Sequence, residues 1–206
     1  MAIITNIEIK RGVAEIYFDD RRILKLRQRD AAFLGLREGL DASLSNIEKT
    51  VCARQANEAY EAALTILDSS ARSVYEIKKK LEQKGFLPLT VNDVCARLKQ
   101  NGLLNDKALA ARLTEGAALS GKGIYAIKRR LASRGIAGDE IEAALNTVSD
   151  KAQLEAALVE AKKLARKYDA DDKHAFKYKL SCALSRRGFE RDTIESAVER
   201  ILDDLS

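Results

Sequence analysis

The segment Gly116-Ala-Ala-Leu-Ser-Gly121-Lys122-Gly123 comes nearest in this sequence to a known chemical motif. It almost spells a phosphate-binding loop, in which glycine amides and a lysine hold the phosphates of a nucleotide. Gly123, however, stands where the motif requires the Ser or Thr that holds magnesium, and the segment follows a helical pattern instead of a strand. We therefore interpret it as a turn between helices and predict no bound nucleotide.

Isolated reactive side chains offer no second catalytic or metal site. His174, the only histidine, stands in a polar and charged stretch, and we expect it on the surface. The pairs Asp171-Asp172 and Asp203-Asp204 are sequence neighbours that point in different directions on a helix, so we expect them to cap helices or carry surface charge. Cys182 lacks a visible base and electropositive pocket, which favours a buried structural thiol. We predict neither enzymatic activity nor a cofactor or metal.

Basic residues, in contrast, recur in a phrase that appears three times. Its copies span residues 77–86, 127–136 and 180–189, and their glycines lie 50 (85 to 135) and then 53 (135 to 188) residues apart. In each copy, two apolar residues four apart share one helical face, a basic residue occupies the last turn, and Gly ends the helix. We expect the apolar residue after each Gly, which is Phe86, Ile136 or Phe189, to pack back onto the helices.

The basic residues of the phrase are candidates for a binding surface. With Ile77 and Leu81 facing the core, Lys79 points away, while Lys80 and Lys84 flank the apolar stripe. Stacked repeats place equivalent residues along one surface. The predicted partner-binding set is Arg72, Lys79, Lys80, Lys84, Lys122, Arg129, Arg130, Arg134, Lys177, Arg186 and Arg187. The alternative is that these are ordinary surface residues whose charges suit the helix C-termini.

Helices must position these residues, since the chain has one Pro, no Trp and many helix-forming residues. Ser73 and Glu76 form a capping box, Thr90 is expected to cap the next helix, and Gly102 to end it. Apolar residues five and twelve positions after the one that follows Gly predict another helix behind each phrase. These residues are Val91 and Leu98, Ile141 and Val148, and Ile194 and Ile201.

The pattern predicts a mostly α fold with three tandem three-helix modules that resemble helix-turn-helix units and pack in series. We place the modules at residues 58–106, 107–150 and 151–206, with first helices over 58–67, 107–119 and 154–167.

Residues 1–57 form a strand-rich extension with a linking helix in this scheme. Alternation at Ile7 and Ile9, a turn at Arg11-Gly12 and strand formers from Val13 to Phe18 predict a small antiparallel sheet of two or three strands. A short helix over 30–37 should end at Gly39, and a longer one should span 46–67.

Composition favours a helical protein of the cytoplasm. Hydrophobic residues make up 46% and charged residues 33%, and the formal net charge of +5 favours a modest attraction to polyanions. Cys52, Cys95 and Cys182 are far apart and odd in number, so we predict reduced, largely buried thiols and no disulfide framework or zinc site. No signal sequence or bilayer-length apolar stretch is visible, so neither export nor membrane insertion is expected.

Four phrases resemble those of the bacterial RecX regulatory proteins, which modulate the RecA recombinase in recombinational DNA repair. They are Arg72 through Phe86, Gly102-Leu103-Leu104-Asn105-Asp106, Gly123 through Ile136, and Arg186-Arg187-Gly188-Phe189. The resemblance covers almost the whole chain. It implies a curved solenoid of the three modules that binds RecA filaments on DNA and suppresses ATP hydrolysis, strand exchange and co-protease function. Leu109 stands where the family usually has an aromatic residue, and Glu115 and Gly116 interrupt a normally basic stretch.

Two rival functions follow from the residues themselves. Three-helix modules with Lys and Arg can contact phosphates, which predicts direct, sequence-independent and salt-sensitive DNA binding. We expect this binding to be weak, because the chain lacks a dense basic tail and has few aromatic residues for stacking. An ATP-using enzyme would rest on the defective glycine motif.

We expect a monomer, because the polar face of a C-terminal helix over 191–205 can cap the array of modules.

Overall fold

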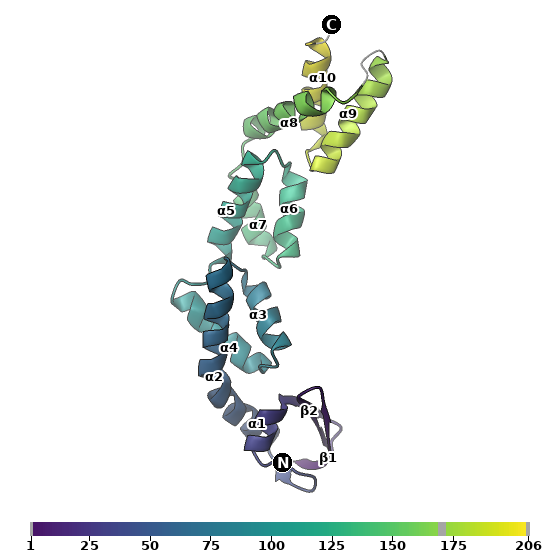
Figure 1. The fold of residues 1–206 in the computed structure, drawn as a ribbon. Coiled ribbons are helices and arrows are strands. Elements are labelled where there is room, and N and C mark those ends of the chain that lie inside the picture. Colours follow the sequence, from purple (N-terminus) through teal and green to yellow (C-terminus); the bar gives the residue numbers. More distant parts are fainter. Residues whose placement is uncertain (1, 169–171, 205–206) are drawn as a thin grey trace. The chain divides into compact units, whose positions relative to one another are not determined.

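The computed structural model describes residues 2–168 and 172–204. Within them the chain is mostly helical, with helices α1 to α10 and a small N-terminal sheet (Figure 1). This confirms the predicted fold class, while the curved stacking of modules stays a prediction. The chain divides into two compact units, residues 1–104 (unit 1) and 105–206 (unit 2). The predicted four-part division of the chain stays a prediction.

The sheet of unit 1 contains one strand more than we predicted. Its strands are β1 (Ala2–Lys10), β2 (Val13–Phe18), β3 (Ile23–Arg27) and β4 (Asp41–Ala42), in the antiparallel order β3-β2-β1-β4. The predicted turn is present, because Arg11 and Gly12 both have positive φ, 52° and 81°, as a tight hairpin turn requires. The two residues of β4 pair with Ala2 and Ile3 and carry no strand pattern of their own, so only the fold reveals them.

Helix α1 (Gln28–Phe33) begins and ends earlier than the predicted 30–37, and Gly35 follows it with a φ of 61°. Helix α2 (Leu44–Ser69) is longer than the predicted 46–67. Its Ile47 and Val51 pack in the core below the sheet, whereas Ala59 and Ala63 pack in the core of the helices that follow. One continuous helix therefore serves both cores.

Helices α3 (Val74–Gln83) and α4 (Pro88–Gln100) complete unit 1. The predicted capping box is confirmed: Glu76 N–H donates to Ser73 Oγ (3.1 Å) and Ser73 N–H donates to Glu76 Oε2 (2.9 Å). Gly102, with a φ of 71°, follows α4 as predicted. Thr90 is not a cap, because α4 already begins at Pro88. Its buried hydroxyl donates to Gln55 Oε1 (3.2 Å) instead.

Unit 2 consists of two further three-helix modules. The first contains α5 (Asp106–Leu119), α6 (Ile124–Ser133) and α7 (Gly138–Leu145), and the second contains α8 (Asp150–Ala165), α9 (Lys173–Arg187) and α10 (Arg191–Asp203). Each module has its own apolar core. Helix α7 ends before Val148, which is only half-buried, so the predicted helical periodicity fails there. Ser149 instead caps α8 by accepting a hydrogen bond from Ala152 N–H.

The apolar residues of the repeated phrase form the centre of each core. Side chains at the paired positions are at most 1% exposed, and the apolar residue after each Gly is at most 5% exposed. The pairs are Ile77 and Leu81, Ile127 and Leu131, and Leu180 and Leu184, and the residues after Gly are Phe86, Ile136 and Phe189. The predicted inward face of each second helix is confirmed.

A buried carboxylate, Asp30, joins the sheet to the helices within unit 1. Asp30 is 1% exposed and accepts hydrogen bonds from Arg27 Nε (2.7 Å) and Gln55 Nε2 (2.8 Å). Gln55 also accepts from Leu87 N–H (2.9 Å), at the start of α4. Arg27 lies 4.5 Å from the centre of the Phe86 ring and donates to Glu58 (3.0 Å). These contacts couple β3, α1, α2 and α4.

Asp30 makes the stability of unit 1 sensitive to acid. Burial raises the pKa of Asp30, but hydrogen bonds from Arg27 and Gln55 and nearby positive charge lower it by more, so the pKa lies below its ordinary value. The stabilisation is therefore fully present above the unfolded pKa of about 3.9 and is lost as pH falls through the lower folded pKa.

We expect Asp30→Asn to lower the free energy of unfolding by roughly 2–3 kcal/mol at pH 7 and to flatten the loss of stability below pH 4, measured by urea unfolding. If the variant lost stability below pH 4 as steeply as the wild-type protein, Asp30 would not be the source of the acid sensitivity.

Candidate binding surface

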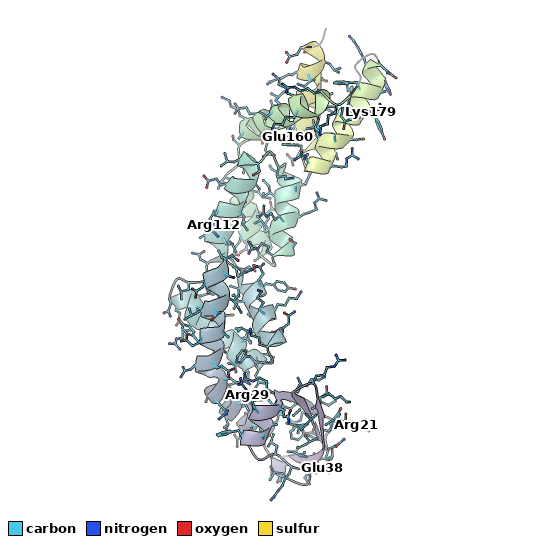
Figure 2. All side chains as sticks on the ribbon, in the orientation of Figure 1. Arg21, Arg29, Glu38, Arg112, Glu160 and Lys179 are labelled. Carbon is cyan, nitrogen blue, oxygen red and sulfur yellow. The ribbon has the colours of Figure 1, made fainter. Side chains whose placement is uncertain are left out.

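The second helix of each module in unit 2 carries basic residues and no acidic ones. Helix α6 contributes Lys128, Arg129 and Arg130, and α9 contributes Lys173, Lys177, Lys179, Arg186 and Arg187. Figure 2 shows Lys179 on α9. In unit 1, α3 carries Lys78, Lys79 and Lys80 together with two glutamates. These helices are the strongest candidates for contact with a polyanionic partner.

The predicted residues of unit 1 divide into exposed and structural cations. Lys79 is exposed, with its Nζ 5.9 Å from the centre of the Tyr75 ring, whereas Lys80 is half-buried. Lys84 is exposed and lines a hollow of about 640 Å³ together with Arg11 and Arg29. Arg72 is mostly covered and lies 3.7 Å from Glu76, the capping-box carboxylate. Lys79 and Lys84 are thus the most accessible members of the set in this unit.

The predicted residues of unit 2 divide in the same way. Arg129, Arg130, Lys177 and Arg186 are exposed, while Lys122 and Arg134 are half-buried.

Arg187 has a structural contact that the sequence pattern does not reveal. Its Nη2 lies 3.2 Å from Oε2 of Glu160, a side chain that is only 7% exposed, and Lys163 lies 3.0 Å from the other oxygen. Glu160 lies on α8 (Figure 2). Arg187 therefore stabilises unit 2 whether or not it also binds a partner.

A backbone junction holds α6 against the end of α9. Gly123 N–H donates to Arg187 O (3.1 Å), and Tyr125 N–H donates to Gly188 O (2.9 Å). The chains cross so closely that a Cβ on Gly123 would lie 2.2 Å from the Gly188 carbonyl. Ile124 N–H is also used, because Gln153 Oε1 accepts it (3.1 Å). The two acid-free helices are thereby fixed relative to each other.

The same junction explains the near match to a phosphate-binding loop. Helix α5 contains Gly116 and ends at Leu119, and Gly121, with a φ of 69°, lies in the turn before α6. The amides at the start of α6 already donate to Arg187, Gly188 and Gln153 and are not directed at a ligand. Residues 120–123 form a turn between helices, as interpreted from the sequence, while residues 116–119 are the end of α5.

The remaining reactive side chains occupy separate positions. His174 is exposed on α9, and Cys182 is half-buried instead of buried as expected. Asp172 caps α9 by accepting from Ala175 N–H (3.0 Å), while Asp171 lies outside the described residues. Asp204 lies 3.6 Å from Lys162. Over residues 2–168 and 172–204, no three His, Cys, Asp or Glu side chains gather as metal ligands would, and no helix is long and apolar enough to cross a membrane.

Sequence reasoning missed two groups of residues. Gln55 and Gln153 are buried and link helices through their side-chain oxygens, a role that polar residues in a helical pattern do not signal. Tyr75, Tyr125 and Tyr178 are exposed and lie at equivalent positions, each two residues before a copy of the repeated phrase. The repeat period could have identified these tyrosines.

Several known proteins that are similar to this chain are described as RecX. The families described as "RecX, first three-helix domain" and "RecX, third three-helix domain" match residues 59–98 and 151–198. The regulatory protein RecX of Halalkalibacterium halodurans is 29% identical over 205 residues, covering 96% of this chain and 77% of that protein. The regulatory protein RecX of Bacillus cereus strain AH820 is 28% identical over 204 residues, covering 97% and 72%.

Solved structures agree with the sequence similarities. A crystal structure of regulatory protein RecX has a TM-score of 0.67 at 25% identity, over 97% of this chain and 100% of the other. RecX from Lactobacillus salivarius has a TM-score of 0.69 at 28% identity, over 75% of this chain and 99% of the other. The likeness extends across both units of the chain.

Two glycines of unit 2 should respond in opposite ways to the same substitution. Gly123→Ala places a methyl group against the Gly188 backbone, so we expect a loss of about 3 kcal/mol or more and a lower Tm. Gly116→Ala adds a methyl group with nothing within 4 Å, inside a helix, and should raise stability by about 0.5–1 kcal/mol. Calorimetry on both variants checks the junction. A neutral Gly123→Ala would show that α6 and α9 are not closely joined.

Proposed function

Because this chain belongs to the RecX family of regulatory proteins, we propose that it binds RecA recombinase filaments assembled on DNA and restrains their ATP hydrolysis, strand exchange and co-protease activity. The observation that carries the proposal is the fixed pair α6 and α9, which bears eight basic residues and no acidic one. A filament of protein on DNA is a repeating, anionic target, and a rigid basic surface suits it.

The exposed cations carry the contact in this proposal. They are Lys79 and Lys84 in unit 1, and Arg129, Arg130, Lys177 and Arg186 in unit 2. The half-buried members Arg72, Lys80, Lys122, Arg134 and Arg187 support them, with Arg187 held by Glu160. No bond chemistry by this chain is required, and the protein acts as a monomer in the cytoplasm.

Direct, sequence-independent DNA binding is the second candidate. The absence of acidic residues from α6 and α9 favours phosphate contacts as much as filament contacts. Such binding would be weak and would fall steeply with salt, since it depends on counterion release.

RecA-dependent ATP hydrolysis on single-stranded DNA separates the two candidates. This protein is titrated at two salt concentrations, and its binding to bare DNA is measured in the same buffers. We expect it to suppress ATP hydrolysis at protein concentrations that leave bare DNA uncoated. Suppression that appears only once DNA is saturated would favour the DNA-binding function and overturn regulation through the filament.

Neutralising the basic surface should weaken filament binding. Replacing Lys79, Lys80, Arg129 and Arg130 by Ala removes four charges from the second helices, and we expect about tenfold or greater loss of filament affinity. A control that replaces Lys99, Lys107, Arg112 and Lys151, four exposed cations of the first and third helices, removes the same charge. Equal affinities for the two variants, measured by fluorescence anisotropy, would place the contact elsewhere.

A further inference from the structure

Three tyrosine side chains are exposed to solvent at equivalent positions of the three modules. Tyr75, Tyr125 and Tyr178 are 48%, 53% and 68% exposed, whereas the other tyrosines of the chain are half-buried. Within the described residues, the hydroxyls of Tyr125 and Tyr178 make no hydrogen bond. The core does not need these rings. Exposed tyrosines near basic residues are typical of the side chains that dominate protein interfaces.

Two of the three tyrosines line a single hollow on unit 2. The hollow has a volume of about 750 Å³ and lies where α6 meets α9 and α10. Phe189 and Ile194, which are 2% and 8% exposed, supply apolar lining. The start of α6 is fixed by the hydrogen bond from Tyr125 N–H to Gly188 O, so the Tyr125 backbone is held in place beside the hollow.

The charges that line the hollow are balanced. Lys177 and Arg191 are positive, Glu195 and Glu199 are negative, and Arg191 Nε donates to Glu195 Oε1 (2.9 Å). The other two charged residues of the lining are Lys177 on α9 and Glu199 on α10. Neither forms an ion pair with another described residue. A nucleic-acid strand would bring phosphates close to carboxylates here, which costs affinity. A polypeptide with an apolar side chain and mixed charge matches both the lining and the charges.

We infer that this hollow receives a polypeptide segment of a protein subunit in the filament. An apolar or aromatic anchor side chain lies against Phe189 and Ile194 beside the two tyrosines, with an acidic neighbour facing Lys177 and a basic one facing Glu199. The inference rests on the proposed function. It adds that unit 2 contacts a protein subunit at this site, beyond the contacts that the exposed cations make with the filament.

The tyrosines are tested by replacing both with alanine in the full chain. Tyr125→Ala with Tyr178→Ala should weaken binding to RecA filaments on single-stranded DNA by about tenfold or more and change binding to bare DNA by less than about twofold. Leu119→Ala, at a side chain that is 84% exposed and outside the hollow, is the matched control and should change neither. Circular dichroism verifies that the variants fold.

Reversing one charge distinguishes protein from nucleic acid directly. Glu199→Lys should weaken filament binding if the hollow holds a polypeptide, and should strengthen it, together with DNA binding, if the hollow holds a nucleotide. Glu61→Lys makes the same charge change at an exposed residue of α2 that does not line the hollow.

Each outcome decides between the alternatives. Loss of filament binding with bare-DNA binding retained supports the inference. Equal loss of both in the tyrosine variant, or a stronger filament complex with Glu199→Lys, assigns the hollow to nucleic acid and overturns it. Unchanged filament binding in the tyrosine variant overturns the inference while leaving the proposed function intact. Wild-type protein that binds filaments no better than bare DNA overturns the proposed function and the inference together.

Discussion

The burial of two apolar side chains, one helical turn apart on the second helix of each module, is the contact on which the other features of this protein depend. Leu81, Leu131 and Leu184 are fully buried, and each such side chain contributes about 1.5–3 kcal/mol relative to exposure. The glycine that follows lets the chain reverse, so that Phe86, Ile136 or Phe189 covers the same core. Once this face is inside, the opposite face of the helix must be in solvent.

That constraint explains why the binding candidates lie where they do. On a helix with its apolar stripe buried, the intervening positions are exposed, and they hold Lys79 in α3 and Arg129 in α6. The same geometry exposes the tyrosines two positions before the first apolar residue. Core packing thus presents an aromatic and a basic residue one turn apart in α3 and α6, whereas Cys182 occupies the basic position in α9.

Buried polar side chains then set how neighbouring elements join. Gln55 connects Asp30 to the start of α4, and Gln153 accepts the amide at the start of α6. Because an unsatisfied polar group inside a protein costs about 1–3 kcal/mol, such groups favour one arrangement over its competitors more than they add stability. Glu160 on α8 has the same role, because it forms an ion pair with Arg187 of α9 and lies against Gly121 in the turn before α6.

The sequence by itself determined the helical class, the repeated phrase and the inward residues, because apolar spacing and glycine positions reflect local geometry that every copy must satisfy. It also placed Lys79 and Arg129 on the outside. Only the tertiary structure decided that β4 joins the sheet, that Thr90 bonds Gln55 instead of capping α4, and that α7 stops before Val148. It likewise decided that Arg187 pairs with Glu160 and that Tyr125 and Tyr178 line one hollow. These features join residues far apart in the chain, and their partners are set by three-dimensional packing, which local spacing does not encode.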